Sequence, residues 1–364
     1  VLRQIERLAR LPRTGSAAVA LVAVVSCLAG ALSWGFGLMV GAMLAREVAR
    51  RSASPGGPTI HYPLVAAAGY CGMLVWHGGL SGSAPLLVAT PGHFLEEQIG
   101  LIPVGATIGG WQNLLLLAAL VVVCPLALSR MAPAKGVQPP PPPEPDPAPD
   151  LDGEPARGAE RLERSRLLGR GIALLGLAVV AERLWWEGPA EALDLNLLNL
   201  GFLFFGLFLH GTAAGYVRAF SEGARASAGI ILQFPFYAGI FGVMKHSGLI
   251  AVVAGGVASV STEQTLPLTT FLSAGALNLF VPSGGGQWGV QGPVIVEAAQ
   301  QLGADLPRAV MGLAYGDEWT NMLQPFWALP LLALTGLRAR DIMGYCAALM
   351  LIVTPLFVGA LLLP

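Results

Sequence analysis

Long stretches without a charged side chain recur along the whole chain, and their spacing predicts its structural elements. About 18 or more apolar residues in a row can cross a ~30 Å hydrocarbon layer as one helix. Three of the apolar segments are longer than this and contain glycine, so they predict helices that break inside the membrane. The pattern therefore predicts an all-α polytopic membrane protein. The expected apolar segments are residues 16–45, 62–90, 111–129, 167–185, 195–210, 226–244, 265–302, 309–337 and 342–363.

The two longest uncharged stretches each contain a central break. One has 33 residues between Glu263 and Glu297 and is interrupted by VPSGGGQWGVQGP at residues 281–293, and the other has 32 residues and is interrupted by WGFG at residues 34–37. A straight helix of that length would measure roughly 50 Å, whereas two arms of about 15 residues would each enter the hydrocarbon only partway. Both stretches therefore predict re-entrant helical hairpins. The predicted hairpins span residues 14–50 and 265–302.

The composition agrees with a membrane protein and excludes other classes. The chain is 54% hydrophobic and 12% charged, whereas roughly 25% of residues are charged in soluble domains. A net charge of -1 provides no basic surface for nucleic acid, so membrane lipid is an expected partner and nucleic acid is not. The four cysteines lie in apolar segments at irregular spacings, which favours buried thiols over a disulfide framework or a zinc site. They are Cys27, Cys71, Cys124 and Cys346.

Faint matches between distant parts of the chain predict an internal repeat. AGALS at residues 29–33 recurs as AGALN at 274–278, and APLLVAT at 84–90 recurs as LPLLALT at 329–335, both at an offset of 245. Internal duplication of this kind is common in secondary transporters. The segment QPPPPPEPDPAPD between the copies is extended and cannot contribute to a core, so it predicts a solvated linker. The expected domains are a first repeat at 1–130, a proline-rich charged linker at 131–166 and a second repeat at 167–364.

Charges at the segment ends predict the orientation of the two hairpins. Lys and Arg concentrate on the cytoplasmic side of membrane proteins. The first hairpin begins after Arg13 and carries Arg46 at its end, whereas the second lies between Glu263 and Glu297. The hairpins are therefore predicted to enter from opposite faces, as in an inverted-topology repeat. The linker is then cytoplasmic and the C-terminus periplasmic, and Lys245 is the one charge that falls at an outer end.

Four broken stretches are the expected place of a functional site. Backbone that leaves helical geometry at membrane depth loses N–H and C=O partners, so it persists where it lines a polar cavity or is buried in protein. Glycines allow a ligand close to the backbone, half-helix N-termini favour an anion, and freed carbonyls favour a cation. The pattern thus predicts co-transport of an anion with Na⁺ or H⁺. A glycine-rich phosphate loop is the alternative, but no Lys-Ser/Thr pair follows it and no strand precedes it. The broken stretches are SWGFG at 33–37, HGGLSGS at 77–83, NLFVPSGGGQW at 278–288 and YGDEWTNMLQP at 315–325.

Polar side chains at these breaks supply the candidate chemistry. Asp317 and Glu318 form the only acidic pair inside an apolar segment, and ionisable groups at membrane depth are functional by default; the alternative is a helix end near the headgroups. His77 is either a ligand or a buried histidine bonded to a carbonyl, and the tryptophans either line the site or only pack. No arginine lies in the breaks, so helix ends, hydroxyls and amides would hold an anion.

No catalytic residue, cofactor or firm metal site is predicted. If Na⁺ is the coupling ion, it is expected near Ser33, Ser81, Asn278 and Asp317. The candidate substrate- and ion-binding residues are Ser33, Trp34, Gly35, Gly37, His77, Gly79, Ser81, Ser83, Asn278, Ser283, Gly284, Gly285, Gly286, Gln287, Trp288, Asp317, Glu318, Thr320 and Asn321.

Five long motifs together closely resemble the bacterial short-chain fatty acid transporter family, whose members carry acetoacetate, butyrate and similar small monocarboxylates. The motifs are SWGFGLMVGAMLAREVARR, GGLSGSAPLLVATPG, AGIILQFPFYAGI, VPSGGGQWGVQGP and AYGDEWTNMLQPFWALP, and they cover nearly the whole chain. The resemblance implies a carrier in the cell inner membrane with an elevator-type transport domain that carries both hairpins. It also implies a scaffold that makes a homo-oligomer, expected to be a dimer.

Three features depart from the family pattern. They are the proline-rich linker, Glu318 at a position where a neutral amide is familiar, and the lack of further N-terminal membrane segments before the point that matches Val1. The last feature implies a shortened start.

The resulting hypothesis is a secondary active transporter, or symporter, of short monocarboxylates that works by alternating access. One alternative is a carrier of another small organic anion such as a dicarboxylate, which the lack of arginine at the breaks disfavours. A different class of protein is an intramembrane enzyme that uses Asp317, Glu318 and His77 as acid and base, and this alternative predicts that the three side chains converge within hydrogen-bond reach.

Overall fold

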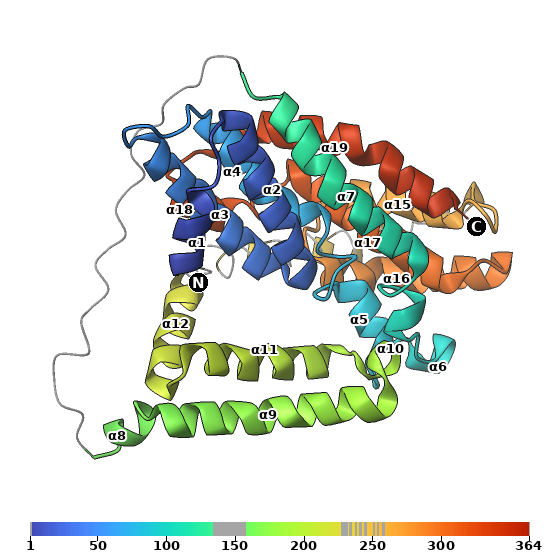
Figure 1. Ribbon diagram of the computed structural model, residues 1–364. Coiled ribbons are helices and arrows are strands. Elements are labelled where there is room, and N and C mark those ends of the chain that lie inside the picture. Colours follow the sequence, from blue (N-terminus) through green and yellow to red (C-terminus); the bar gives the residue numbers. More distant parts are fainter. Residues whose placement is uncertain are drawn as a thin grey trace.

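The computed structural model describes residues 2–133, 158–226 and 259–363, together with scattered positions between 232 and 256. Within these residues the chain is all-helical, and no strand occurs (Figure 1). Most of the proline-rich linker and most of the predicted span 226–244, together with Lys245, lie outside the described residues. The prediction of an all-α chain is confirmed for the part that is described.

The helices fall into two series with a similar order. The first series is α1 (Leu2–Ala9), α2 (Gly15–Leu32), α3 (Trp34–Ser52), α4 (Tyr62–Tyr70), η1 (Cys71–Leu74), α5 (Ser83–Ala89), α6 (Glu96–Ile99), η2 (Val104–Ala106) and α7 (Trp111–Arg130). After the linker come α8 (Glu160–Glu163), α9 (Arg166–Glu187), α10 (Pro189–Ala192), α11 (Leu195–His210) and α12 (Ala213–Ala226). The chain continues with α15 (Leu266–Asn278), α16 (Gly284–Leu302), α17 (Leu306–Thr320), η3 (Asn321–Leu323), α18 (Leu329–Thr335) and α19 (Ala339–Leu362).

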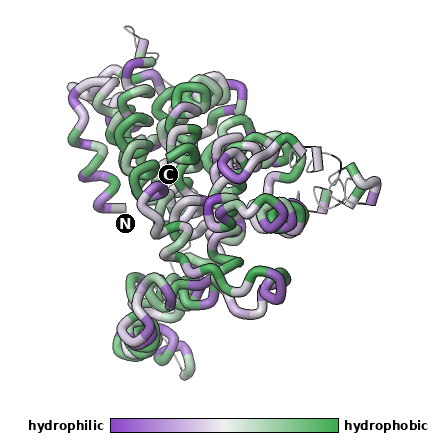
Figure 2. Tube along the Cα trace, turned by 90° about the vertical axis from the view of Figure 1, so that its right-hand side faces the viewer, coloured by the Kyte–Doolittle hydropathy of each residue, from purple (hydrophilic) through white to green (hydrophobic). Residues whose placement is uncertain are grey.

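Three of these helices are long and apolar enough to cross a membrane, namely α2, α7 and α19. The count over the described residues becomes four if the bent pair α11 and α12 is taken as one span. Most residues of the helical bundle are hydrophobic (Figure 2). Length and composition therefore indicate a membrane protein.

At the positions of both predicted hairpins the chain forms two helices with a short break between them, and α2, the first helix of the first pair, is by itself long enough to span a membrane. In the first hairpin only Ser33 separates α2 from α3, and its backbone is extended (φ −162°, ψ 132°). The arms touch closely at the turn, since a Cβ on Gly37 would lie 2.5 Å from the Cα of Gly30. In the second hairpin residues 279–283 separate the arms, and the Ser283 hydroxyl accepts a hydrogen bond from the Gly286 N–H at the start of α16.

One close contact occurs at matching positions of the two series. A Cβ on Gly72 would overlap the carbonyl oxygen of Ser26, and a Cβ on Gly316 would overlap that of Phe271. Ser26 and Phe271 are 245 residues apart and Gly72 and Gly316 are 244 apart, so both pairs agree with the motif offset of 245 to within one residue. In both series a glycine lets the broken helix approach the first arm of the hairpin to backbone contact.

The helices α9 and α11 pack against each other beside the bundle (Figure 1). At Gly211, whose φ of +76° suits glycine, the chain turns by 117° into α12. No membrane segment was predicted for residues 211–225, because their charges interrupt the apolar pattern. Helix α12 instead carries two basic residues, Arg218 and Arg225, and Glu222 between them pairs with Arg218.

All four cysteines are buried, as expected, and Cys27 lies beside both Cys71 and Cys124. The Cys27 and Cys71 sulfurs lie 3.5 Å apart, although 44 residues separate them in sequence. We therefore expect a small membrane-permeant oxidant such as copper phenanthroline to join them as a disulfide. A protease site inserted at residues 53–56, which are exposed, would cut the chain between the two cysteines.

After cleavage, the two fragments should stay together on a non-reducing gel and separate on a reducing gel. In a Cys124→Ser background, which removes the other thiol beside Cys27, Cys71→Ser should abolish the cross-link and Cys346→Ser should preserve it. Fragments that separate without reductant would show that α2 and η1 are not packed in this register.

Candidate functional site

The two broken helices carry the polar groups of the site. His77 lies between η1 and α5, and Asp317 and Glu318 lie in the last turn of α17. The chain can turn back after His77 because Gly82 has no side chain: a Cβ there would overlap the carbonyl oxygen of His77. Glycine at this position therefore lets the break fold tightly around the histidine.

The side chains of the two breaks meet in one buried cluster. The Nδ1 atom of His77 lies 2.7 Å from Oδ2 of Asp317. The backbone N–H groups of His77 and Gly78 donate to Oε2 of Glu318 at 2.8 and 3.2 Å. His77 and Glu318 are 0% exposed and Asp317 is 1% exposed. Residues about 240 positions apart thus form a charged group sealed from solvent.

The hydrogen bonds define the protonation state of His77. The backbone N–H of Ala84 donates to Nε2 at 3.1 Å, and a backbone N–H can only donate. Nε2 therefore has no proton, so the ring proton is on Nδ1 and is donated to Asp317. His77 is a neutral imidazole in this arrangement, and Asp317 is the acceptor of its proton.

The tip of the second hairpin rests on this cluster. A Cβ on Gly284 would lie 2.6 Å from Cε1 of His77 and 3.1 Å from the Trp76 ring. The Trp76 ring stacks on the imidazole of His77 with centroids 4.4 Å apart. A Cβ on Gly285 would lie 3.8 Å from Cβ of Ser83. Glycines at the tip therefore let α16 begin directly above the first break.

A second polar group surrounds the amide of Asn278 at the end of α15. Its Nδ2 donates to the Asp317 carbonyl at 2.8 Å, to Thr320 Oγ1 at 3.0 Å and to Asn321 Oδ1 at 2.9 Å. The Gln324 amide donates in turn to the Asn278 carbonyl at 2.8 Å. These bonds hold the end of the hairpin arm against the broken helix next to the carboxylates.

The tip of the first hairpin forms a third group. The backbone N–H of Trp34 donates to Ser81 Oγ at 2.9 Å. The Trp34 ring meets the Trp327 ring edge-on, with centroids 5.1 Å apart. Gly79 lies against the Ala31 carbonyl, where a Cβ would overlap the oxygen. Of the residues predicted at this tip, Gly35 has open space around its Cα.

Buried polar atoms without a partner gather at these breaks. More than about 90% of buried polar groups in proteins are hydrogen-bonded, so unpaired ones are available to bind a ligand. Three of those found are donors and three are acceptors. In the described residues they are Trp76 Nε1, Trp288 Nε1, Asn321 Nδ2, Asn278 Oδ1, Gln287 Oε1 and Glu318 Oε1.

Several contacts at the site were not predicted from the sequence. Trp76, which precedes His77, was not considered because an aromatic residue in an apolar run is indistinguishable from core. Gln291 lies one turn after Gln287, and its amide donates to Ser273 Oγ at 2.7 Å while its Oε1 accepts from Gln287 at 3.2 Å. The i, i+4 spacing of two glutamines in an apolar helix was a signal that could have identified this pair.

The convergence of His77, Asp317 and Glu318 is the geometry that the enzyme alternative predicted. Both ring nitrogens of His77 are engaged, however, one with Asp317 and one with the Ala84 N–H. The imidazole therefore has no free nitrogen with which to abstract a proton from a substrate. In the described residues no three His, Cys, Asp or Glu side chains are placed to hold a metal ion.

Comparison with known proteins gives a consistent result. Residues 1–363 match a family described as "Short chain fatty acid transporter". A protein of Escherichia coli, provisionally named a short-chain fatty acid transporter, is 44% identical over 367 residues, covering 100% of this chain and 81% of the relative. One of Haemophilus influenzae with the same provisional name is 40% identical over 368 residues, covering 98% and 80%. No solved structure matches.

Proposed function

The chain belongs to the short chain fatty acid transporter family, and on that premise we propose that it is a secondary active transporter of small monocarboxylates such as butyrate and acetoacetate. We propose that a cation, H⁺ or Na⁺, moves with the substrate. The function is transport rather than catalysis, in agreement with the engagement of both His77 nitrogens.

The unpaired donors at the breaks carry this proposal. Trp76 Nε1, Trp288 Nε1 and Asn321 Nδ2 are buried N–H donors without acceptors, and a carboxylate is an acceptor-only group. Neutral donors can hold one carboxylate, whereas a dicarboxylate would require compensation of a second charge, normally by arginine. The site thus favours a monocarboxylate over the dicarboxylate alternative.

Alternating access is supported by the two similar series of helices. Each has a hairpin, a broken helix and a long apolar helix in the same order, and the Ser26–Gly72 contact has its counterpart at Phe271–Gly316. An inverted repeat gives a central site two equivalent gates, one on each side of the membrane. The proposed mechanism is an elevator-type movement of both hairpins.

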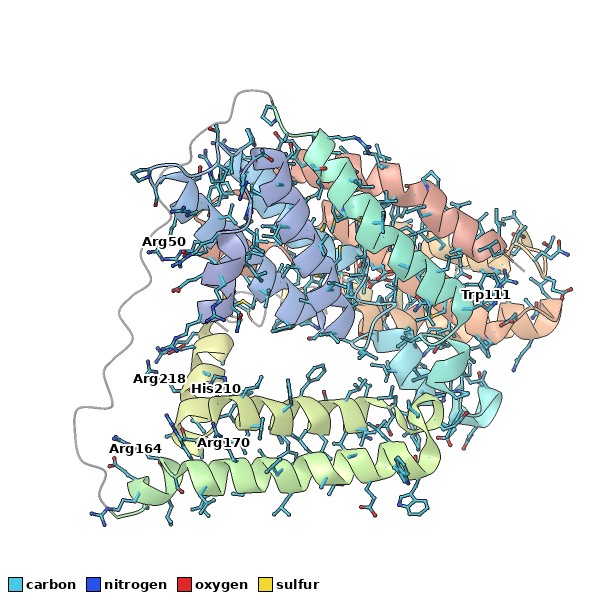
Figure 3. All side chains as sticks on the ribbon, viewed as in Figure 1. Arg50, Trp111, Arg164, Arg170, His210 and Arg218 are labelled. Atoms are coloured by element: carbon cyan, nitrogen blue, oxygen red, sulfur yellow. The ribbon has the colours of Figure 1, made fainter. Side chains whose placement is uncertain are left out.

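The proposed orientation places the basic residues in the cytoplasm of a bacterial cell, with the chain in the inner membrane. Arg50, Arg164, Arg170 and Arg218 lie toward one side of the molecule and Trp111 toward the other (Figure 3). The positive-inside rule then makes the arginine side cytoplasmic and the opposite side, where α19 ends, periplasmic. Helix α12, bent away from α11, would lie along the cytoplasmic surface with its charged residues in water.

The pair α9 and α11 is proposed as the scaffold. Its outward side chains are apolar and exposed, with Leu175 at 72% and Trp185 at 82%. Such a surface is stable only in lipid or against another subunit. A homodimer through this pair is the proposed assembly.

Uptake into liposomes tests the proposed function. The purified full-length protein, reconstituted in liposomes loaded with unlabelled acetoacetate, should take up labelled acetoacetate faster than protein-free liposomes do. Protein-free liposomes are the essential control, because short fatty acids cross lipid bilayers in their neutral form. Unlabelled butyrate should compete with the label and unlabelled succinate should not. Uptake no faster than the control would refute the proposal.

A further inference from the structure

We infer that Glu318 binds the co-transported proton, and that its Oε1 carries this proton in the arrangement seen here. The inference rests on the proposed transport function, and it concerns this chain in particular, because a neutral amide is the familiar residue of the family at this position. The hydrogen bonds and the charges around the carboxyl group carry the argument.

The two oxygens of the Glu318 carboxyl group differ in their hydrogen bonds, although the two backbone donors by themselves would also suit a carboxylate. Both backbone donors, the N–H groups of His77 and Gly78, bind Oε2, and Oε1 has no partner. A carboxylate has two equivalent acceptor oxygens, whereas a carboxylic acid has one carbonyl oxygen and one hydroxyl. The observed asymmetry assigns the carbonyl to Oε2 and the hydroxyl to Oε1.

The surroundings disfavour a negative charge on Glu318. Among the described residues no Lys, Arg or His side chain forms an ion pair with Glu318. His77 supplies no positive charge, because the Ala84 N–H keeps Nε2 unprotonated. Glu318 also lies in the last turn of α17, where the helix dipole presents its negative end. A second buried charge beside Asp317 would therefore be uncompensated, and such groups take up a proton instead.

The titratable groups that face Glu318 come from two elements. His77 lies in the first break, and Asp317 and Tyr315 share α17 with Glu318. The Tyr315 hydroxyl is occupied, since it donates to Asn113 Oδ1 at 3.0 Å. Asn113 in turn donates to the Gly78 carbonyl at 2.8 Å. None of the three neighbours offers a cation that could replace the proton.

The protonated group explains how the proton and the substrate would be coupled. A hydroxyl on Oε1 can donate a hydrogen bond to a substrate carboxylate, together with the unpaired donors described above. An ionised Glu318 has no proton to donate and repels the anion. Substrate anion and proton therefore bind together and cross together without net charge.

The test compares Glu318→Gln with the matched variant Glu297→Gln. Glutamine keeps the acceptor oxygen and the size of Glu318 but cannot titrate, and Glu297 is an exposed carboxyl on α16. In liposomes, an inward proton gradient should drive accumulation of labelled acetoacetate by the wild type and by Glu297→Gln. Glu318→Gln should lose this accumulation to the level of protein-free liposomes, while exchange across the membrane without a gradient remains above that level.

Two results in the transport assay would overturn the inference. One is proton-driven accumulation by Glu318→Gln at the wild-type level, and the other is accumulation by the wild type under a Na⁺ gradient alone. A wild type that neither accumulates nor exchanges acetoacetate refutes the proposed function instead, and the protonation of Glu318 is then decided by spectroscopy.

Infrared difference spectra of the detergent-solubilised protein provide that independent measurement. At neutral pH, the wild type and Glu297→Gln should show the carbonyl band of a buried carboxylic acid that shifts in deuterated buffer. Glu318→Gln should lack this band. Absence of the band from the wild type, or its presence in Glu318→Gln, would overturn the inference whatever the transport assays show.

Discussion

Replacing His77 by alanine is expected to destabilise the protein by about 3–5 kcal/mol and to abolish transport, because the change leaves a buried carboxylate without its partner. Asp317 would lose the Nδ1–H that lies 2.7 Å from its Oδ2, and the Ala84 N–H would lose its acceptor. Both groups are sealed from water, so solvent cannot replace the lost bonds. Thermal unfolding in detergent and acetoacetate exchange in liposomes measure the two effects.

Two further variants make this prediction specific. His210→Ala removes an exposed histidine from the end of α11, and it should change neither stability nor exchange. The double variant His77→Ala/Asp317→Ala removes the stranded charge together with its partner, so it should unfold at a higher temperature than His77→Ala alone. If the double variant loses as much stability as the two single variants together, or more, the His77–Asp317 pair is not coupled as proposed.

Gly316→Ala is expected to cost about 1–3 kcal/mol, because the added methyl would overlap the carbonyl oxygen of Phe271. Backbone cannot move aside as a flexible side chain can, so α15 and α17 would have to separate. The separation would also stretch the bonds from Asn278 to Thr320 and Asn321. The temperature of thermal unfolding should therefore fall, and the rate of acetoacetate exchange should fall with it.

The control for this prediction is Gly344→Ala in α19, where nothing lies within 4 Å of the added methyl. Alanine favours a helix over glycine by about 1 kcal/mol, so this variant should be as stable as the wild type or slightly more so. Gly72→Ala, at the matching contact in the first series, should behave as Gly316→Ala does. A Gly316→Ala protein as stable as the control would exclude a tight contact between α15 and α17.

The positions of the helix breaks could be predicted from the sequence, because the local composition of an apolar stretch changes where its helix breaks. Glycine, proline and polar residues inside long apolar runs identified the regions around Ser33, His77 and Asp317, and the structure ends or interrupts helices at all three. The helix after His210 was not predicted, because the charged residues of α12 interrupt the apolar pattern that would indicate its helical periodicity. A surface helix parallel to a membrane is difficult to distinguish from a charged loop on hydropathy alone.

The hydrogen-bond partners of the candidate residues could not be predicted from the sequence. Asn278 was expected to offer hydrogen bonds to a substrate, yet its Nδ2 is fully occupied by Asp317, Thr320 and Asn321, and only its Oδ1 is free. The Trp319 Nε1 donates to the Met350 carbonyl and to Thr354 Oγ1, which fixes α17 to α19. Residue type predicts what a side chain can bond, whereas its neighbours decide which bonds it makes.

The sequence by itself determined that this is a helical membrane protein with broken segments that concentrate its polar groups. Hydrophobic length, glycine content and charge are properties of neighbouring residues, so they can be read along the chain. Only the tertiary structure decided that His77 is neutral, that Asp317 accepts its proton and that Oε1 of Glu318 has no partner. Those facts depend on the Ala84 N–H and on backbone groups about 240 residues from the carboxylates. Contacts between such distant residues are set by how the helices pack, and local pattern carries no information about them.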